Sequence, residues 1–385
     1  MIIIDELLNI SPLLEYTGVT SDEKVIFFDI ETTGFSALST QLYLIGCVYL
    51  DDNEWKMRQW FVEDHNEEKE CLKNFSTFLK NYTTVIHFNG DGFDIPYLNK
   101  KYARYKLPSP FEGLRSIDIY KKLIPFKKFL GLESLKQKSI ERFLSIERED
   151  CFGGGELIYV YYEYLEKKED MALKLLLMHN HDDVIGMLNL LPILSYPALK
   201  DTNTLSLANK EIINLTDYND SSSKKLLLEF TTALSFPVYI KYEMPYGILL
   251  TLESNKVKLL IPIHSEEMKY FYTNYKDYYY LPQEDTAIHK SVAQFVDKAY
   301  RTQAKACNCY TRKASEYIPV PYKNTADLIN TYSSLYNTDL YTFRRNHEDK
   351  EFFCEINSLI PISSSEEFLS SLLTTYTKTL FSEIF

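Results

Sequence analysis

The sequence lacks the features that mark fibrous, secreted and membrane proteins. Glycine and proline number only 12 and 14 among 385 residues, which excludes collagen-like and linker-like chains. No stretch reaches the roughly 18 uncharged apolar residues that a membrane span requires. The first residues, MIIIDELLNI, lack the basic region and the long apolar segment of a secretion signal. We therefore expect a cytoplasmic protein with no membrane partner.

Closely spaced cysteine pairs are also lacking. The six cysteines are dispersed, and only Cys307 and Cys309 lie near each other in the sequence. Because no C-x-x-C pair is present, a four-cysteine zinc site is not supported. We expect the thiols to be reduced.

An excess of positive charge is absent as well. The 42 basic and 54 acidic residues give a net charge of −12, so the long-range field repels polyanions. A nucleic acid would have to meet a local basic surface. Residues 95–145 carry twelve Lys or Arg against four acids, and residues 286–313 carry six against one. The first segment predicts phosphate contacts or a solvated helical surface, and the second suggests a further grip on nucleic acid.

The length and composition are those of a folded protein with two or three domains, since 45% of the residues are hydrophobic and 25% are charged. Apolar runs at 24–31, 42–50 and 55–62 predict consecutive antiparallel strands, and later strands alternate with helices. This order indicates an α/β domain with a mixed sheet covered by helices. The second half, with strand-like runs and then helices such as 287–303, predicts a separate α+β domain. The predicted parts are an N-terminal extension (1–20), the α/β domain (21–196), a linker (197–224) and an α+β domain of unknown role (225–385).

Two carboxylates interrupt the apolar strand VIFFDIETTG. Asp29 and Glu31 are separated by one residue, so in a strand they project from the same face, roughly 6–7 Å apart. Two like charges on one side of a buried strand are unfavourable alone. They therefore either lie in water at an edge or hold a cation.

A third carboxylate follows another apolar strand, in the segment HFNGDGFDIPYL. Gly90 and Gly92 permit a tight turn there, and Asp94 stands at the start of the next predicted helix. Aspartate is a preferred N-cap residue, and capping is compatible with metal binding. Asp94 alone does not distinguish the two roles.

The fourth carboxylate lies in the long helical segment LLLMHNHDDVIGMLNLL. At about 100° per residue, Asp183 and His179 are about 40° apart at the margin of an apolar stripe, whereas His181 points elsewhere. Taken singly, either residue is typical of a solvated boundary position.

Together, the segments DIETTG, NGDGFDIPYL and HNHDDV resemble the three exonuclease motifs of the ribonuclease-H-like DEDD superfamily. The similarity is to the YprB-like bacterial proteins and to the proofreading exonuclease domains of family B DNA polymerases. Residues 132–150 and 153–165 also resemble the helical stretch that YprB-like proteins carry before the last motif. The resemblance covers residues 20–195 and implies a ribonuclease-H-like mixed sheet flanked by helices.

The resemblance also implies a chemistry, namely 3′-5′ exonuclease activity on single-stranded DNA or RNA with two Mg²⁺ or Mn²⁺ ions. It implies that Asp29 bridges both ions, that Glu31 and Asp183 complete the first site, and that Asp94 serves the second. Carboxylate oxygens suit these hard cations. Without metal, the four acids would raise one another's pKa by repulsion.

One position departs from the family pattern. Family members place a histidine five residues, or a tyrosine four residues, before the last aspartate. Here Met178 and His179 occupy these places, so a histidine has the tyrosine-type spacing. Because histidine gains and loses a proton near neutral pH, we predict that His179 is the general base.

Other residues beside the motifs are candidates for substrate contact. Thr32 and Asn89 are placed to contact the terminal nucleotide, and Phe35 and Tyr97 to stack on a base. Aromatic residues beside a catalytic strand are more often part of the core. Asp118, at the end of a short strand, is a structural candidate and not a metal ligand.

Two other functions remain open from the sequence. An endonuclease of the ribonuclease H type is disfavoured, because that class does not carry D-x-E on its first strand. The main alternative is a non-catalytic nucleic-acid or protein-binding module on the same fold. Its second domain would then act through an aromatic surface such as Tyr278, Tyr279 and Tyr280, with a protein partner that the sequence does not identify.

Overall fold

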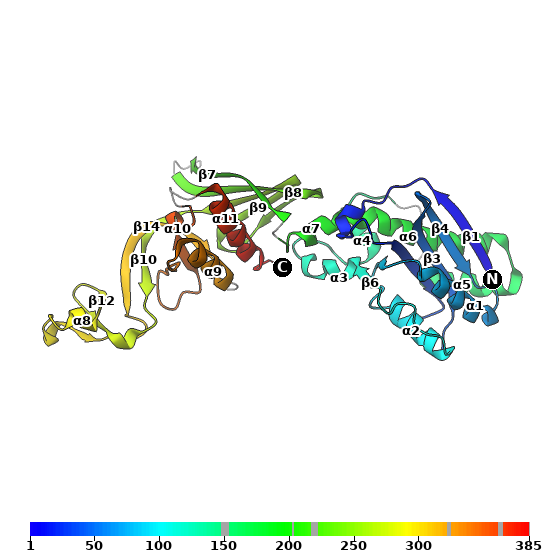
Figure 1. Cartoon of the computed structure of the whole chain (residues 1–385), viewed down its shortest axis with the longest axis horizontal. Helices are drawn as coiled ribbons and strands as arrows, with labels where there is room; N and C mark the ends of the chain where they lie inside the picture. Colours follow the sequence, from blue (N-terminus) through cyan, green and yellow to red (C-terminus); the bar gives the residue numbers. More distant parts are fainter. Residues whose placement is uncertain (148–153, 202–203, 217–221, 322–324, 361–364, 385) are drawn as a thin grey trace. The chain divides into compact units, whose positions relative to one another are not determined.

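The computed structural model describes residues 1–147, 154–201, 204–216, 222–321, 325–360 and 365–384. The chain divides into two compact units, Met1–Pro197 and Ala198–Phe385, and each is described by itself (Figure 1). Residues 148–153, which belong to the predicted helical stretch before the last motif, lie outside the described residues. Within the described ranges, no helix is both long enough and apolar enough to cross a membrane.

The first unit is built on one mixed sheet of six strands. These are β1 (Ile2–Leu8), β2 (Val25–Thr32), β3 (Leu42–Asp51), β4 (Glu54–Phe61), β5 (Thr84–His87) and β6 (Arg115–Asp118). Their order is β1-β4-β3-β2-β5-β6. The neighbours from β1 to β2 pair antiparallel, whereas β2, β5 and β6 pair in parallel. The predicted mixed sheet is therefore confirmed.

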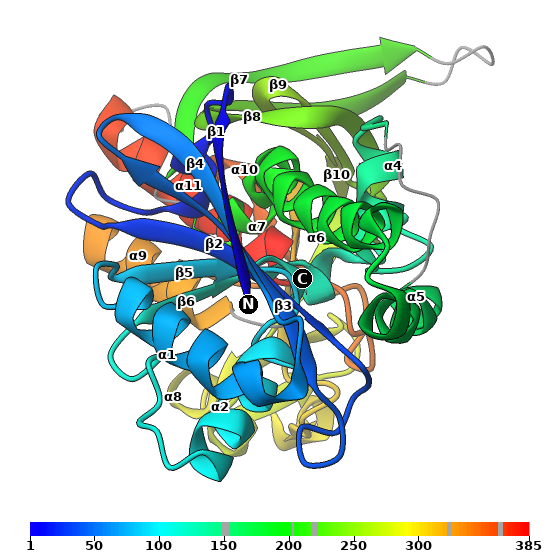
Figure 2. The same cartoon turned by 90° about the vertical axis from the view of Figure 1, so that its right-hand side faces the viewer.

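Helices cover both faces of this sheet. They are α1 (Glu68–Leu79), α2 (Asp94–Arg104), α3 (Ile119–Leu123), α4 (Gln137–Phe143), α5 (Gly154–Lys167), α6 (Asp170–Leu190) and α7 (Ser195–Ala198), with 3-10 turns η1 (Leu14–Thr17), η2 (His65–Glu67), η3 (Ile124–Phe126) and η4 (Leu191–Leu194). One face packs on α1 and α2 through a core that includes Phe28, Trp60 and Phe75. The other packs on α5 and α6 through residues such as Tyr43 and Tyr161 (Figure 2). Because β2 is covered on both faces, its first four residues form an unbroken apolar run.

The second unit contains three small sheets and a helical layer. Its strands are β7 (Ser206–Thr216), β8 (Ser222–Glu243), β9 (Leu249–Pro262), β10 (His264–Phe271), β11 (Tyr278–Leu281), β12 (Thr286–His289), β13 (Thr302–Gln303), β14 (Tyr310–Val320) and β15 (Phe352–Glu355). Its helices are α8 (Lys290–Ala293), α9 (Thr325–Tyr336), α10 (Ile356–Leu359) and α11 (Glu366–Phe381), with 3-10 turns η6 (Pro245–Gly247), η7 (Tyr275–Asp277) and η8 (Lys298–Tyr300). The strand orders are β7-β8-β9, β10-β14-β15 and β12-β11-β13. This arrangement of strands and helices agrees with the predicted α+β class.

The structure corrects two of the predicted segment assignments. Residues 1–20 are no separate extension, because β1 pairs with β4 along its whole length, from Ile2 opposite Phe61 to Leu8 opposite Trp55. Residues 197–224 are no simple linker, because they contain β7. Both β1 and β7 are edge strands with many exposed side chains, so polar residues follow the short apolar run of β1 and are spread along β7.

The predicted helix at 287–303 is also wrong. Strands β10 and β14 pair over eight residues, from His264 opposite Tyr317 to Phe271 opposite Tyr310, and residues 272–309 between them fold into a small lobe. In this tip lobe, only α8 is an α-helix among the described residues of that stretch. The buried side chains are small ones such as Ala287, Ala304 and Cys309, covered by tyrosines of β11 and its neighbours, and they suit short strands better than a helix face.

A buried ion pair ties α1 and α2 to the chain that enters β3. Lys101 Nζ lies 2.6 Å from Glu68 Oε1, and the two side chains are 1% and 4% exposed. Lys101 also donates to the main-chain oxygen of Thr40 at 2.5 Å. Glu68 accepts hydrogen bonds from the Leu42 N–H at 2.7 Å and from the Tyr105 hydroxyl at 2.6 Å. These bonds fix the end of the loop that follows β2.

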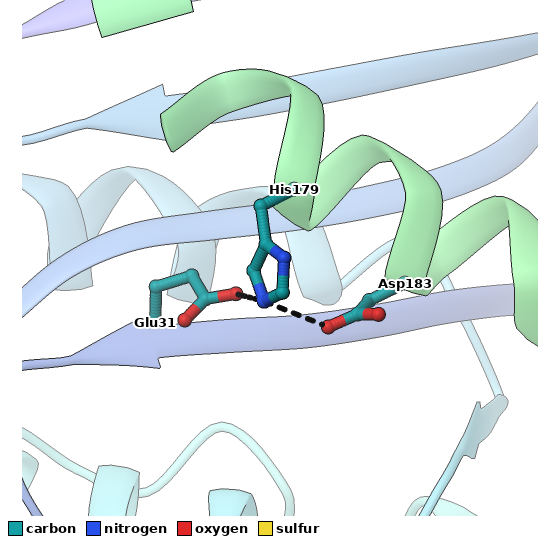
Figure 3. A group of neighbouring side chains, drawn as sticks. All are labelled: Glu31, His179 and Asp183. Atoms are coloured by element: carbon teal, nitrogen blue, oxygen red, sulfur yellow. Dashed lines mark ion pairs between the residues drawn. The ribbon is translucent and has the colours of Figure 1, made fainter. Parts of the chain in front are cut away.

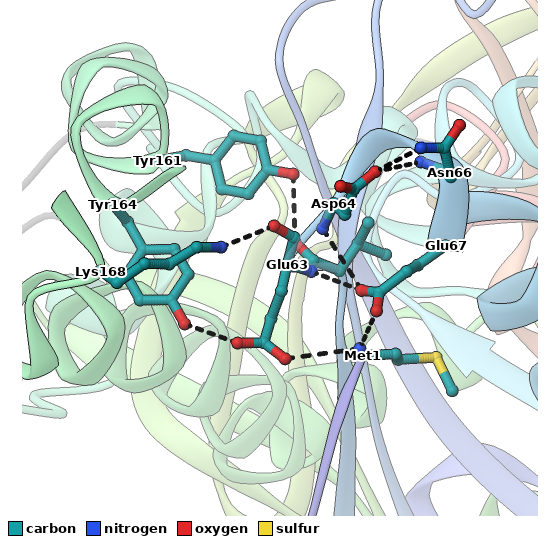
Figure 4. A network of polar contacts seen from close by, with 9 residues as sticks. Met1, Glu63, Asp64, Asn66, Glu67, Tyr161, Tyr164 and Lys168 are labelled. Atoms are coloured by element: carbon teal, nitrogen blue, oxygen red, sulfur yellow. Dashed lines mark hydrogen bonds and ion pairs between the residues drawn. The ribbon is translucent and has the colours of Figure 1, made fainter. Parts of the chain in front are cut away.

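A second polar network holds α5 against the loop after β4 (Figure 4). Asp64 caps η2, and Glu67 accepts the main-chain N–H of Glu63 at 2.9 Å. From α5, the Tyr164 hydroxyl donates to the Glu63 carboxylate at 3.0 Å, and Lys168 donates to the main-chain oxygen of Glu63 at 2.7 Å. The network anchors α5 on the same face of the sheet as α6.

Candidate active site

Strand β2 delivers two carboxylates to the sheet face that α6 covers. Phe28 and Ile30 enter the core on the α1 side, and the intervening Asp29 and Glu31 point the other way. Asp29 lies opposite Gly46 of β3, and the regular pairing shifts just after Glu31. The carboxylates therefore emerge where the strand leaves the regular sheet.

Helix α6 places a histidine and a third carboxylate beside Glu31 (Figure 3). His179 Nε2 lies 3.6 Å from Glu31 Oε1 and 3.3 Å from Asp183 Oδ2, and the imidazole is buried. Gln137 Nε2 donates to the main-chain oxygen of Asp183 at 3.0 Å, and the Tyr43 hydroxyl donates to Glu31 Oε2 at 3.4 Å. The ligand atoms of the three residues lie within 4.8 Å of one another, as a metal site requires.

Asp94 enters from the first residue of α2, after a tightly braced turn. The Asp118 carboxylate accepts the main-chain N–H groups of Asn89 at 3.0 Å and Asp91 at 3.2 Å. His87 Nδ1 accepts the N–H of Gly90, which lies between them, at 3.0 Å. The brace holds the turn so that Asp94, which is only 5% exposed, starts the helix next to β2.

His87, Asp91 and Asp118 also approach one another closely enough to resemble a ligand set. Their polar atoms, however, are engaged with main-chain N–H groups and with the side chains of Ser116 and Lys121. These contacts are those of a structural brace, which is the role expected for Asp118.

The electrostatics of the site reflect crowded negative charge. Burial, and then the charges of Asp94, Glu31 and Asp183, raise the pKa of Asp29 well above its usual range. Burial also raises the pKa of Asp94 to about 7, against the opposing hydrogen bonds from main-chain N–H groups. Four acids held together at this cost fit a divalent cation with oxygen ligands, such as Mg²⁺ or Mn²⁺.

The acids and His179 open into a cleft of about 640 Å³. Its walls also carry the aromatic residues Phe35, Phe88, Phe93 and Tyr120 and the basic residues Lys136 and Lys138. Phe35 is 92% exposed and meets the Phe93 ring edge-on, with centroids 5.9 Å apart. The cleft therefore combines negative charge at its floor with aromatic and basic groups on its walls.

The four predicted substrate contacts separate into two groups. Asn89 and Phe35 line the cleft. Thr32 is not among the lining residues, and its hydroxyl donates to the Gly34 main-chain oxygen at 3.0 Å. Tyr97 is 3% exposed and belongs to the core between α2 and the sheet, so the prediction that it stacks on a base is wrong. Its position on α2 turns it inward, one helical turn after Asp94.

The predicted basic segment 95–145 contributes only part of its charge to the cleft. Lys136 and Lys138 line it. Lys101 is buried with Glu68, and Lys121 pairs with Asp91, so these cations serve the fold. A count of charges along the sequence could not separate the two groups.

Asn180 is a positioning residue that the sequence did not reveal. Its amide donates to Asp29 Oδ2 at 3.1 Å, and its oxygen accepts from Gln59 Nε2 at 3.0 Å. Gly46 of β3 lies between Gln59 of β4 and Asp29 of β2, in one row across the three strands. Asn180 lies over Gly46 and bonds to the side chains on either side of it. A Cβ atom on Gly46 would lie 1.9 Å from Asn180 Oδ1, so any other residue there would have to displace the Asn180 side chain.

Replacing Asn180 tests this positioning role. We expect Asn180→Ala to lower the affinity of the site for Mg²⁺ or Mn²⁺ about 10- to 100-fold, because the Asp29 carboxylate loses its orienting donor. Asn189→Ala is the matched control, since Asn189 is an exposed residue of the same helix. Thermal unfolding at several metal concentrations checks this, and equal metal affinities for the two variants would contradict the role.

Comparison with known proteins gives one family match. Residues 26–195 match the family described as the RNase_H superfamily. Among solved structures, the family B DNA polymerase of the hyperthermophilic archaeon Pyrobaculum calidifontis aligns with 93% of this chain and 65% of its own, at 11% identity and a TM-score of 0.39. Exonuclease I, by itself and in an ExoI/SSB-Ct complex, aligns over 55% of each chain at 10% and 11% identity, with TM-scores of 0.30. The chain thus spans slightly under two thirds of the polymerase and about half of exonuclease I.

Proposed function

We propose that the chain, whose residues 26–195 match the RNase_H superfamily, is a divalent-metal-dependent 3′-5′ exonuclease that acts on single-stranded DNA or RNA ends. The observation that carries the proposal is the convergence of Asp29, Glu31, Asp94 and Asp183 in one cleft with His179. These residues come from three segments that are far apart in the sequence. Their shared location supports the DEDD type of nuclease.

The carboxylates would hold two Mg²⁺ or Mn²⁺ ions. Asp29 would contribute to both positions, Glu31 and Asp183 to the first, and Asp94 to the second. When bound, the ions would offset the negative charge of the phosphodiester and acidify a water molecule. The raised pKa values of Asp29 and Asp94 support this role, since a cation relieves the cost of ionising them.

His179 would take the proton of the attacking water at Nε2. This atom faces Glu31 and Asp183 at the floor of the cleft, and the imidazole is shielded from bulk water. A histidine turned away from the carboxylates would have excluded the role, and the observed orientation supports it.

His179→Gln tests the general base. We expect kcat to fall about 10²-fold, because the glutamine amide cannot take a proton from the attacking water. His181→Gln is the control, as His181 lies on the same helix but contacts Asp182 and Glu6 instead. A kcat of His179→Gln equal to that of His181→Gln would assign proton transfer to another group.

The walls of the cleft support a single-stranded nucleic acid substrate. The exposed ring of Phe35 is free to stack on an unpaired base, and Lys136 and Lys138 are placed to meet phosphates. Asn89 offers an amide to the terminal nucleotide. The same groups would bind DNA or RNA.

The test is degradation of 5′-labelled single-stranded DNA and RNA with Mg²⁺ or Mn²⁺. A ladder that shortens from the 3′ end, and that disappears with chelator and in Asp183→Asn, supports the proposal. Comparison of the two oligonucleotides shows whether DNA or RNA is the preferred substrate. The neighbouring Asp182→Asn should keep its activity, because Asp182 pairs with His181 outside the cleft. Absence of cleavage by a chain that binds metal would favour a non-catalytic binding module.

A further inference from the structure

The tip lobe, residues 272–309, exposes large apolar side chains. Phe295 is 84% exposed, Val292 is 56% exposed and Tyr300 is 55% exposed. They lie in and between α8 and η8, within nine residues of one another. Exposed aromatic groups gathered in this way mark interaction surfaces rather than ordinary solvated surface.

Positive charge accompanies these aromatic groups. Lys290, Lys298 and Lys305 are exposed, and none of them forms an ion pair with the parts of the chain that the structure describes. The Arg301 guanidinium lies 4.8 Å from the Tyr279 ring centroid, which holds it at the same surface. A chain of net charge −12 thus keeps exposed lysines without an ion pair in the same lobe as the exposed rings.

The segment that carries the exposed rings, residues 290–305, has four cations against one acid, Asp297, whereas the whole lobe has five cations against four acids. Asp297 caps η8 by accepting the Ala299 N–H at 2.9 Å. Asp285 accepts a hydrogen bond from the Tyr280 hydroxyl at 2.6 Å and lies 3.8 Å from Arg312. The local excess of positive charge therefore belongs to residues 290–305 and not to the lobe as a whole.

From this combination we propose that the tip lobe is a binding surface for single-stranded nucleic acid. Unpaired bases stack on exposed rings without regard to sequence, and lysines and arginines track the phosphates between them. A protein or lipid partner would pack against the apolar side chains. Such a partner would not need aromatic rings together with lysines that form no ion pair. The surface belongs to the second unit, so the inference does not depend on catalysis.

The first arm of the test asks whether the lysines of the lobe contribute to binding. Fluorescence anisotropy of a labelled 20-nucleotide oligothymidylate and oligouridylate, in chelator, reports binding by the full chain without cleavage. The triple substitution Lys290→Gln, Lys298→Gln, Lys305→Gln should weaken binding and reduce the slope of log K against log salt by about 0.7 for each phosphate that the variant no longer binds. The charge-matched control is Lys241→Gln, Lys256→Gln, Lys350→Gln, which removes exposed lysines elsewhere in the second unit.

The second arm measures stacking. Phe295→Leu and Tyr300→Leu keep an apolar side chain but remove the ring, and each should weaken binding about tenfold. Phe295→Trp should bind as well as the unmodified chain or better. A protein-docking surface would tolerate leucine and would not discriminate in this way.

Several outcomes would overturn the inference. They are equal effects of the two lysine triples, unchanged affinity in the leucine variants, or tighter binding to anionic phospholipid vesicles than to oligonucleotides. If lobe variants bind normally while the chain still degrades its substrate, the inference fails and the proposed function stands. If metal-free binding depends on the lobe but no cleavage occurs, the proposed function fails and the inference stands.

Discussion

Asp29→Asn should lower the nuclease rate at least about 10³-fold, because the variant removes the carboxylate at the centre of the proposed metal site. The same substitution should raise the thermal stability of the metal-free chain. Burial and three neighbouring acids raise the pKa of Asp29, so its ionised form is unfavourable in the folded state. Asparagine removes the charge and keeps an oxygen that can accept from Asn180.

Both effects are measurable on one preparation. Scanning fluorimetry with and without Mg²⁺ or Mn²⁺ should show a metal-dependent rise in Tm for the unmodified chain and little rise for Asp29→Asn. Asp51→Asn, at an exposed position at the end of β3, should leave both rate and Tm unchanged. A variant that cleaves normally, or whose metal-free form is less stable, would remove Asp29 from the proposed role.

The pH dependence of the metal-free chain follows from Asp94, whose pKa is raised to about 7. Because the folded-state pKa lies above the unfolded value, this group favours folding most at low pH, and the contribution is lost as pH rises through about 7. Asp94→Asn should therefore stabilise the metal-free chain by about 4 kcal/mol at pH 8 and by less than about 2 kcal/mol at pH 5. Urea unfolding at the two pH values measures the difference, and a gain independent of pH would contradict this assignment.

Lys101→Met should destabilise the first unit by about 3–5 kcal/mol, the second large effect that we expect. The substitution leaves the Glu68 carboxylate buried without its cation, although the Leu42 N–H and the Tyr105 hydroxyl still reach it. It also removes the donor to the Thr40 main-chain oxygen. Urea denaturation followed by tryptophan fluorescence reports this unit, because Trp55 and Trp60 both lie in β4.

Two companion variants separate the effect of an unpaired buried charge from that of a missing hydrogen bond. Glu68→Gln combined with Lys101→Met should recover much of the stability, since no unpaired charge remains. Lys167→Met breaks an exposed pair with Glu163 of similar length, 2.6 Å, and should cost less than about 0.5 kcal/mol. Equal destabilisation by Lys101→Met and Lys167→Met would show that burial of the ion pair does not increase its effect on the free energy of unfolding.

The sequence predicted the parts of the fold that local pattern controls. The apolar runs of β2, β3 and β4 and the long periodic helix α6 are visible because each is buried along most of its length or on one face. The four acids were found because each interrupts or follows such a run. Their roles as metal ligands stay a prediction that the proposed assays address.

What the sequence could not predict depends on partners distant in the chain. Strand β1 is recognisable only beside β4, and the inward position of Tyr97 depends on how α2 packs on the sheet. Asn180 stands between two histidines in a polar segment, and its contact with Asp29 requires α6 to cross β3 at a glycine. A glycine inside the buried strand LYLIGCVYL was a visible sign of a close contact at Gly46. The sequence alone, however, does not show that the contact is with Asn180.

Gly46 carries no functional group, yet the close approach of Asn180 makes it one of the least replaceable positions of the first unit. In a library of all single substitutions scored for activity, position 46 would be indistinguishable from the acids. If the same library were scored for protein abundance in cells, variants at position 46 would differ from variants of the four acids. Amide variants of the acids should fold well, whereas any side chain at position 46 must displace α6 or Asn180. Variants of Gly46 should lose both activity and abundance, whereas amide variants of the acids should lose only activity. The two measurements together would therefore separate residues that the fold of the site needs from residues that its chemistry needs.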